Sequence, residues 1–120
     1  MWKGEIIWRE PSGVDGIQAW LLRYHGSVYE DARVLPGGDL ILRGLADCSR
    51  GISSIEALLV SIGAPRLAQL GFEVTDPIPG AERRLYDRLS AEDADSAHSR
   101  YNGLVRRLVS FERAAAACAR

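Results

Sequence analysis

The strongest constraint in this sequence is the apolar run at residues 55–62, which lies between a polar start and a glycine–proline end. Ser53 stands three residues before Glu56, a spacing typical of the capping box that opens a helix. Apolar side chains then recur at helical intervals through the run. The Gly-Ala-Pro sequence at residues 63–65 should end or bend this helix, because proline lacks an amide donor. We therefore predict a bent and largely buried helix here.

The residues before this helix have the patterns of β-strands. Residues 2–10 alternate between two faces, and residues 27–35 form a weaker candidate strand. A turn at Pro-Gly-Gly-Asp, residues 36–39, precedes a short strand at residues 40–43. Residues 17–25 fit either a strand or a helical stripe; we favour the strand and leave the helix open. The N-terminal half is thus predicted to form an antiparallel sheet of about four strands.

The second half of the chain has helical periodicity. Residues 81–89 suit a short helix, and a long stripe of apolar side chains indicates a final helix from about residue 95 to 116. Gly103 lies inside this last helix, where we expect it to let a neighbouring element approach closely. Strands first and helices last predict an α+β fold, in which a bent helix, a short helix and a long C-terminal helix pack the sheet. We expect a single domain spanning residues 1–120.

Charge and composition narrow the classes of function. The chain has 15 basic and 16 acidic side chains, so its net charge of -1 gives no general field for nucleic acid or an anionic membrane. No apolar run approaches the roughly 20 residues of a membrane span, and the first residues do not resemble a secretory signal. Cys48 and Cys118 are far apart and are expected to be reduced thiols. These features predict a cytoplasmic protein that neither binds nucleic acid directly nor inserts into a membrane.

Three segments carry a resemblance to a known family: residues 43–47 (Arg-Gly-Leu-Ala-Asp), residues 51–59 (Gly-Ile-Ser-Ser-Ile-Glu-Ala-Leu-Leu) and residues 70–74 (Leu-Gly-Phe-Glu-Val). They resemble small uncharacterised bacterial domains with a strand, a Gly-Leu-x-Asp turn, an Ala-Leu helix and a Leu-Gly-Phe exit. Proteins of this size and make-up also occur as immunity partners of contact-dependent toxins. The resemblance implies no catalytic residues and no cofactor. Pro65 departs from the family pattern, in which the helix continues.

The turn before the predicted helix is the first candidate site. Arg50, Gly51, Ser53 and Ser54 could hold an anion through free amides and the helix dipole. The segment has no Gly-Lys-Ser/Thr ending and no Gly-x-Gly-x-x-Gly motif. The structural interpretation, in which the serines cap the helix and the glycine permits the turn, is therefore favoured.

Metal and catalytic chemistry find little support in the sequence. His25 and His98 are isolated and lack partners at ligand spacing. Cys48 could act as a nucleophile only if the fold brought it to His25 and Asp47, and a buried structural thiol is the favoured interpretation. We assign no catalytic residue, no metal ligand and no cofactor. The last helix carries four basic residues, Arg100, Arg106, Arg107 and Arg113. We interpret them as a solvated face rather than as a nucleic-acid site.

The candidate partner-binding residues are acidic and lie near one predicted junction between helices. They are Asp87, Glu92, Asp93 and Asp95. Carboxylates there would complement the basic active site of a nuclease toxin. The leading hypothesis is a non-enzymatic bacterial immunity protein that neutralises a cognate toxin by occluding it. The alternative is a small enzyme or ligand-binding domain with an anion site at residues 50–54, and a third hypothesis is a self-associating subunit that forms a homodimer.

Overall fold

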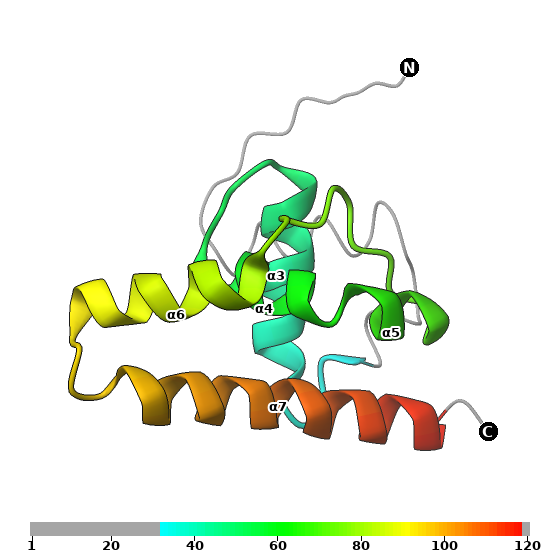
Figure 1. Cartoon of the computed structure of the whole chain (residues 1–120). Coiled ribbons are helices and arrows are strands. Elements are labelled where there is room, and N and C mark those ends of the chain that lie inside the picture. The colour runs from blue at the N-terminus through cyan, green and yellow to red at the C-terminus, as the bar shows by residue number, and fades with distance from the viewer. Residues whose placement is uncertain (1–31, 119–120) are drawn as a thin grey trace.

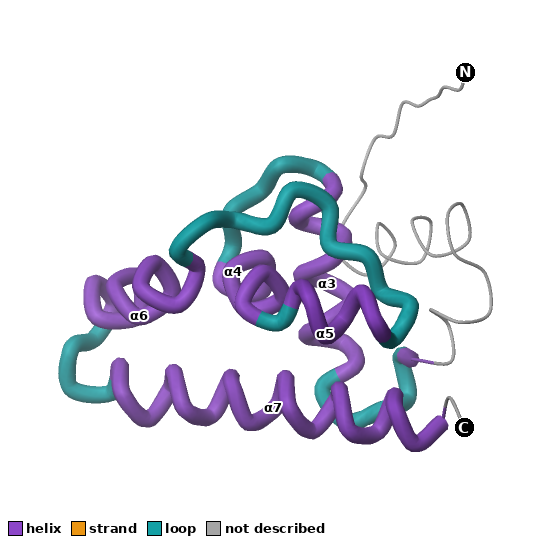
Figure 2. Tube along the Cα trace, turned by 45° about the vertical axis from the view of Figure 1, so that its right-hand side comes forward, coloured by secondary structure: helices purple, strands orange, loops and turns teal. Residues whose placement is uncertain are grey.

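The computed structural model describes residues 32–118, and all regular structure in that range is helical (Figure 1). Helix α4 lies at the centre, where it contacts the four other helices. The two C-terminal helices run in opposite directions and are joined by a short turn at one end of the molecule (Figures 1 and 2). The elements are α3 (Gly38–Ser49), α4 (Ile55–Ile62), α5 (Ala64–Gln69), α6 (Ala81–Glu92) and α7 (Ala97–Cys118).

The prediction of an α+β fold is wrong for the described part of the chain, because residues 32–118 contain no strand. The predicted strand at residues 40–43 lies inside helix α3. Of the predicted strand at residues 27–35, the described end forms a turn in which the Leu35 amide donates to the Ala32 carbonyl at 3.1 Å. The candidate strands at residues 2–10 and 17–25 lie outside the described residues.

The reason for the error in α3 is the role of Gly44. The sequence suggested a Gly-Leu-x-Asp turn, yet the helix continues through this residue. A Cβ atom built on Gly44 would lie 2.4 Å from the Glu56 carbonyl oxygen and 2.7 Å from Cγ1 of Val60, both on α4. Real Cβ atoms do not approach backbone oxygen so closely. Gly44 is therefore the point where α3 and α4 cross with their backbones in close approach.

Helix α4 supplies the middle of the apolar core. Its residues 57–60 are all buried, as the sequence predicted. Ser61, the one buried polar residue in the described part, donates its hydroxyl to the Ala57 carbonyl at 2.8 Å and accepts from the Ile78 amide at 3.0 Å. These two bonds satisfy the hydroxyl, as burial requires, and attach the loop before α6 to the central helix.

The predicted break after α4 and the two C-terminal helices are confirmed. Helix α4 ends at Ile62, and Pro65 lies in the first turn of the short helix α5. Gly71 follows α5 with a φ of 97°, a left-handed conformation that favours glycine and stops the helix. The predicted short helix at residues 81–89 is α6, which extends to Glu92, and the long final helix is α7.

The contacts of α7 confirm its predicted apolar stripe but not the role expected for Gly103. Phe111 is fully buried and its ring meets that of Phe72 edge to face, with the centroids 5.3 Å apart. Tyr101 and Tyr86 form a similar pair between α7 and α6, at 5.7 Å. A Cβ atom on Gly103 would meet nothing within 4 Å, so this glycine does not serve close packing.

A pH-dependent contribution to stability comes from Glu112 on α7. Partial burial raises the pKa of this carboxyl above the ordinary value of 4.5, and the charge of Arg66 on α5 offsets part of that rise. A raised pKa means that the folded state favours the protonated acid, so wild-type stability is lost as the pH rises through the folded pKa. We predict that Glu112→Gln is more stable than wild type at pH 7, and that this difference shrinks as the pH falls through the raised pKa of the folded state and is smallest below about 4.5. Urea unfolding of both proteins at several pH values measures the difference; a constant difference would contradict the assignment.

Candidate functional site

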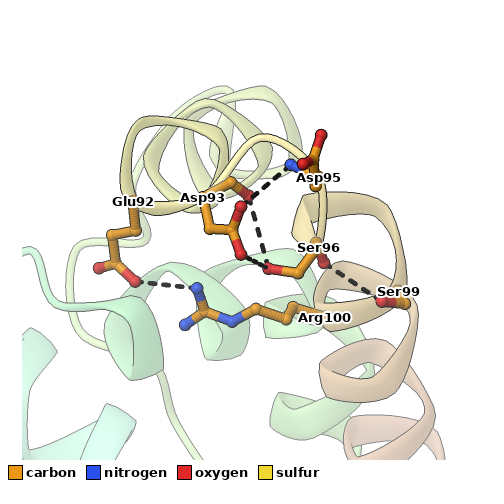
Figure 3. A network of polar contacts seen from close by, with 6 residues as sticks. All are labelled: Glu92, Asp93, Asp95, Ser96, Ser99 and Arg100. Carbon is orange, nitrogen blue, oxygen red and sulfur yellow. Dashed lines mark hydrogen bonds and ion pairs between the residues drawn. The ribbon is translucent and has the colours of Figure 1, made fainter.

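The turn between α6 and α7 brings together three of the four acidic residues proposed for partner binding (Figure 3). Glu92 pairs with Arg100, whose Nη1 lies 3.0 Å from the Glu92 Oε1. One carboxylate oxygen of Asp93 accepts from the Asp95 amide at 3.2 Å, and the other accepts from the Ser96 hydroxyl at 2.9 Å. These bonds hold the backbone of the turn in a defined shape while leaving the three carboxylates exposed.

The fourth proposed residue, Asp87, is not part of this network. It lies in the middle of α6, and its carboxylate is 3.5 Å from Nε of Arg83, one helical turn earlier. Both of these side chains are well exposed, so the pair contributes little to stability.

The segment proposed as an anion cradle is held by contacts within the chain. Gly51 has a φ of 75° and ends the turn that follows α3. Ser54, not Ser53, is the N-cap of α4, and its hydroxyl accepts from the Ala57 amide at 3.0 Å. The same hydroxyl donates to the Asp47 carboxylate at 2.6 Å. The Asp47 carboxylate thus already accepts the hydrogen bond that the Ser54 hydroxyl would otherwise donate to a bound anion.

The shifted cap gives a direct prediction. Ser54→Ala should lower the free energy of unfolding by about 1 kcal/mol, because the Ala57 amide loses its acceptor. Ser53→Ala is the matched control and should change stability by less than about 0.5 kcal/mol, because this exposed side chain does not cap the helix. Chemical denaturation measures the free energy of unfolding of both variants and shows which serine caps the helix. A larger loss from Ser53→Ala would instead support the capping register read from the sequence.

The thiol of Cys48 is a buried structural group. Its sulfur lies 3.6 Å from the Ala57 carbonyl oxygen and 3.8 Å from the Ser61 hydroxyl. Burial raises the pKa of the thiol, an effect that the Ser61 hydrogen bond partly offsets and that the charges of Asp47 and Asp76 add to. A raised pKa disfavours the thiolate, which is the reactive form. His25, the suggested partner of this thiol, lies outside the described residues.

Residues 32–118 contain neither a metal-binding cluster nor a membrane-spanning helix. No group of three or more His, Cys, Asp or Glu side chains in this range is arranged to hold a metal ion. None of the helices in the same range has the length and apolar character needed to cross a bilayer.

The described structure contains a groove that the sequence did not reveal. It has a volume of about 650 Å³ and lies between the first half of α7, the C-terminal half of α6 and the starts of α4 and α3. Its charged lining consists of Arg88, Arg100, Arg107 and the carboxylate of Glu56. Its apolar lining consists of Leu40, Ile55 and Leu104, and Gly103 leaves the space between Arg100 and Arg107 open.

The groove continues beyond Arg107. A second hollow of about 310 Å³ shares Leu40 and Arg107 with the first and extends to the turn at residues 33–39. At the other end, Arg100 belongs both to the groove and to the network of the α6–α7 turn. A continuous surface therefore runs from the acidic turn, along α7, to the segment before α3.

The sequence could not reveal the groove because its lining comes from four helices. The basic residues of α7 were interpreted as one solvated face, with Arg106 and Arg113 sharing a side. In the structure Arg100 and Arg107 line the groove, while Arg106 and Arg113 are exposed outside it. The only signal in the sequence was the seven-residue spacing of Arg100 and Arg107 around Gly103.

Comparisons with known proteins add no identification. No protein family, no curated protein and no solved structure matches this chain significantly. The resemblance of residues 39–74 to small bacterial domains stays a prediction. Its helix is present as α4, whereas its strand and Gly-Leu-x-Asp turn are replaced by helix α3.

Proposed function

We propose that this chain is a non-enzymatic binding domain that recognises a partner protein through the groove along α7. The observation that carries the proposal is the combination of an apolar floor with a rim of three arginines in that groove. Protein interfaces commonly have an apolar centre and a polar rim, and arginine is enriched among their energetically important residues. Leu40, Ile55 and Leu104 would supply the apolar centre, and Arg88, Arg100 and Arg107 the polar contacts.

The specific form of this proposal is a bacterial immunity protein that acts in the cytoplasm and occludes a cognate toxin domain. The acidic turn adjoins the groove through Arg100, so a single partner could cover both. Against the basic active site of a nuclease toxin, the exposed carboxylates of Glu92, Asp93 and Asp95 would provide charge complementarity and faster association.

Co-expression with the product of the adjacent open reading frame tests the proposal. The expected result is co-purification of the two proteins and rescue of growth when the neighbour is toxic. Charge reversal at Asp95 should slow association with a basic partner, because it removes a complementary charge. The exposed Asp95 carboxylate accepts no hydrogen bond in the described structure, so this change should leave the fold intact. Failure of the two chains both to bind and to rescue growth would exclude the immunity function.

A second candidate function is the binding of a small anion in the same groove. The start of α4 opens there, and the amides of Ile55 and Glu56 precede the first intrahelical hydrogen bond. Such amides and the helix dipole favour anions. The carboxylates of Glu56 and Asp47 oppose this, since both lie at the same helix start. Inorganic phosphate that shifts the Ile55 amide resonance at millimolar concentration would favour this candidate.

A further inference from the structure

The groove, as lined by the described residues, has an excess of positive charge, and two of its three arginines already contact other groups of the chain. Nη1 of Arg88 donates to the Ser53 carbonyl, which ties α6 to the start of α4. Arg100 is held by Glu92 at 3.0 Å. A guanidinium has five N–H donors, so one such contact leaves donors for a ligand.

Arg107 differs from the other two because no ion pair engages it within residues 32–118. It stands at the point where the two hollows meet, and it is exposed. Among the described residues that line the larger hollow, only Glu56 has the opposite charge. The groove is therefore electrostatically suited to an anionic partner group, with Arg107 as the guanidinium most available to it.

The spacing along α7 indicates what kind of anion fits. Arg100 and Arg107 are seven residues apart, which places them on one face of the helix about 10.5 Å apart along its axis. A ligand with two anionic groups at this separation can contact both arginines without drawing their side chains together, and Arg100 then stays near Glu92. Two carboxylates on a partner helix at positions i and i+7 have the same separation.

The surface between the two arginines is apolar and hollow. Leu104 lies there, and Gly103 contributes no side chain, so nothing would lie within 4 Å of a Cβ atom at that position. An apolar side chain of the ligand would occupy this space between its two carboxylates. None of the described residues that line the larger hollow is aromatic, so this lining offers none of the stacking contacts that single-stranded nucleic acid uses.

We infer that the groove binds an acidic amphipathic segment of a partner protein, in which two carboxylates contact Arg100 and Arg107 and an apolar side chain between them fills the space beside Gly103. The inference rests on the proposed binding function and specifies the partner's chemistry. Carboxylates are matched by the planar donor pairs of arginine, and an apolar residue is matched by Leu104.

Fluorescence anisotropy with a labelled helical peptide tests the inference on the full chain. The probe has glutamates seven residues apart with leucine between them, and a second probe replaces each glutamate with glutamine. We expect the acidic probe to bind at least tenfold more tightly than the glutamine probe, with affinity that falls as salt is added. Equal binding of the two probes would overturn the inference.

Matched variants locate the binding. Arg107→Glu should weaken binding of the acidic probe at least tenfold. Arg106 is the exposed neighbour of Arg107 and lies outside the groove, so Arg106→Glu should change the affinity less than twofold. Gly103→Trp should also abolish binding by filling the hollow, with circular dichroism confirming that each variant is folded. An equal loss from Arg106→Glu would indicate general charge attraction and overturn the inference. So would competition by inorganic phosphate or single-stranded DNA as strong as that by unlabelled peptide.

The same variants separate this inference from the proposed function. A protein partner identified by co-purification that binds Arg107→Glu and Gly103→Trp as tightly as wild type would overturn the inference and the role of the groove, and only a binding function through another surface would stand. If neither the probe nor the product of the adjacent reading frame binds, both fail together. Loss of that partner with Arg107→Glu but not with Arg106→Glu would support both.

Discussion

Replacing Gly44 with valine is expected to lower the free energy of unfolding by about 3 kcal/mol or more, since it overpacks the crossing of α3 and α4. The first carbon of the new side chain would lie 2.4 Å from the Glu56 carbonyl oxygen, and the backbone of α4 cannot move away without disturbing the buried residues 57–60. Chemical denaturation followed by circular dichroism measures the loss.

A second helical glycine provides the control for this prediction. Gly103→Ala should stabilise the protein by about 0.5–1 kcal/mol, because alanine favours the helix and a Cβ atom there meets nothing within 4 Å. The two substitutions are therefore predicted to change the free energy of unfolding in opposite directions. A stability for Gly44→Val close to that of wild type would mean that residues 43–47 form the open turn suggested by the sequence.

Replacing Ile41 with alanine is expected to cost about 3 kcal/mol of unfolding free energy, within the range for a buried aliphatic side chain. In helix α3 this side chain is fully buried, together with Leu42 and Leu45. In a strand at residues 40–43, alternation would instead place Ile41 beside Arg43, on the face opposite Leu40 and Leu42.

Leu40→Ala is the matched comparison for Ile41→Ala. Leu40 is only partly buried at the edge of the groove, so its loss should cost about 1 kcal/mol. Thermal or urea unfolding of both variants shows which substitution costs more stability. A larger loss from Leu40→Ala than from Ile41→Ala would contradict the helical assignment of α3.

The parts of the fold that the sequence predicted are those in which local chemistry decides. Pro65 prevents α4 from continuing, and Gly71 stops α5, because of backbone properties that need no neighbours. The stripe of α7 repeats over many turns, so its periodicity identified the helix and its buried face, including Phe111. Helix α6 was predicted for the same reason and proved a few residues longer.

The predictions that failed depend on partners distant in sequence. A glycine in a short apolar segment fits a turn or a close helix crossing equally well, and only the position of Glu56 on α4 decides for Gly44. The cap of α4 moved from Ser53 to Ser54 because Asp47, at the end of α3, accepts the Ser54 hydroxyl. Neither fact can be read from local spacing.

By itself, the sequence determined the apolar helices of the second half of the chain, their ends and the lack of a strong overall charge. Only the tertiary structure decided that α3 is a helix and that Arg88, Arg100 and Arg107 line one groove. The physical reason is that helical periodicity and proline or glycine stops act within a few residues. A groove exists only once α3, α6 and α7 have packed around α4 and left a space between them.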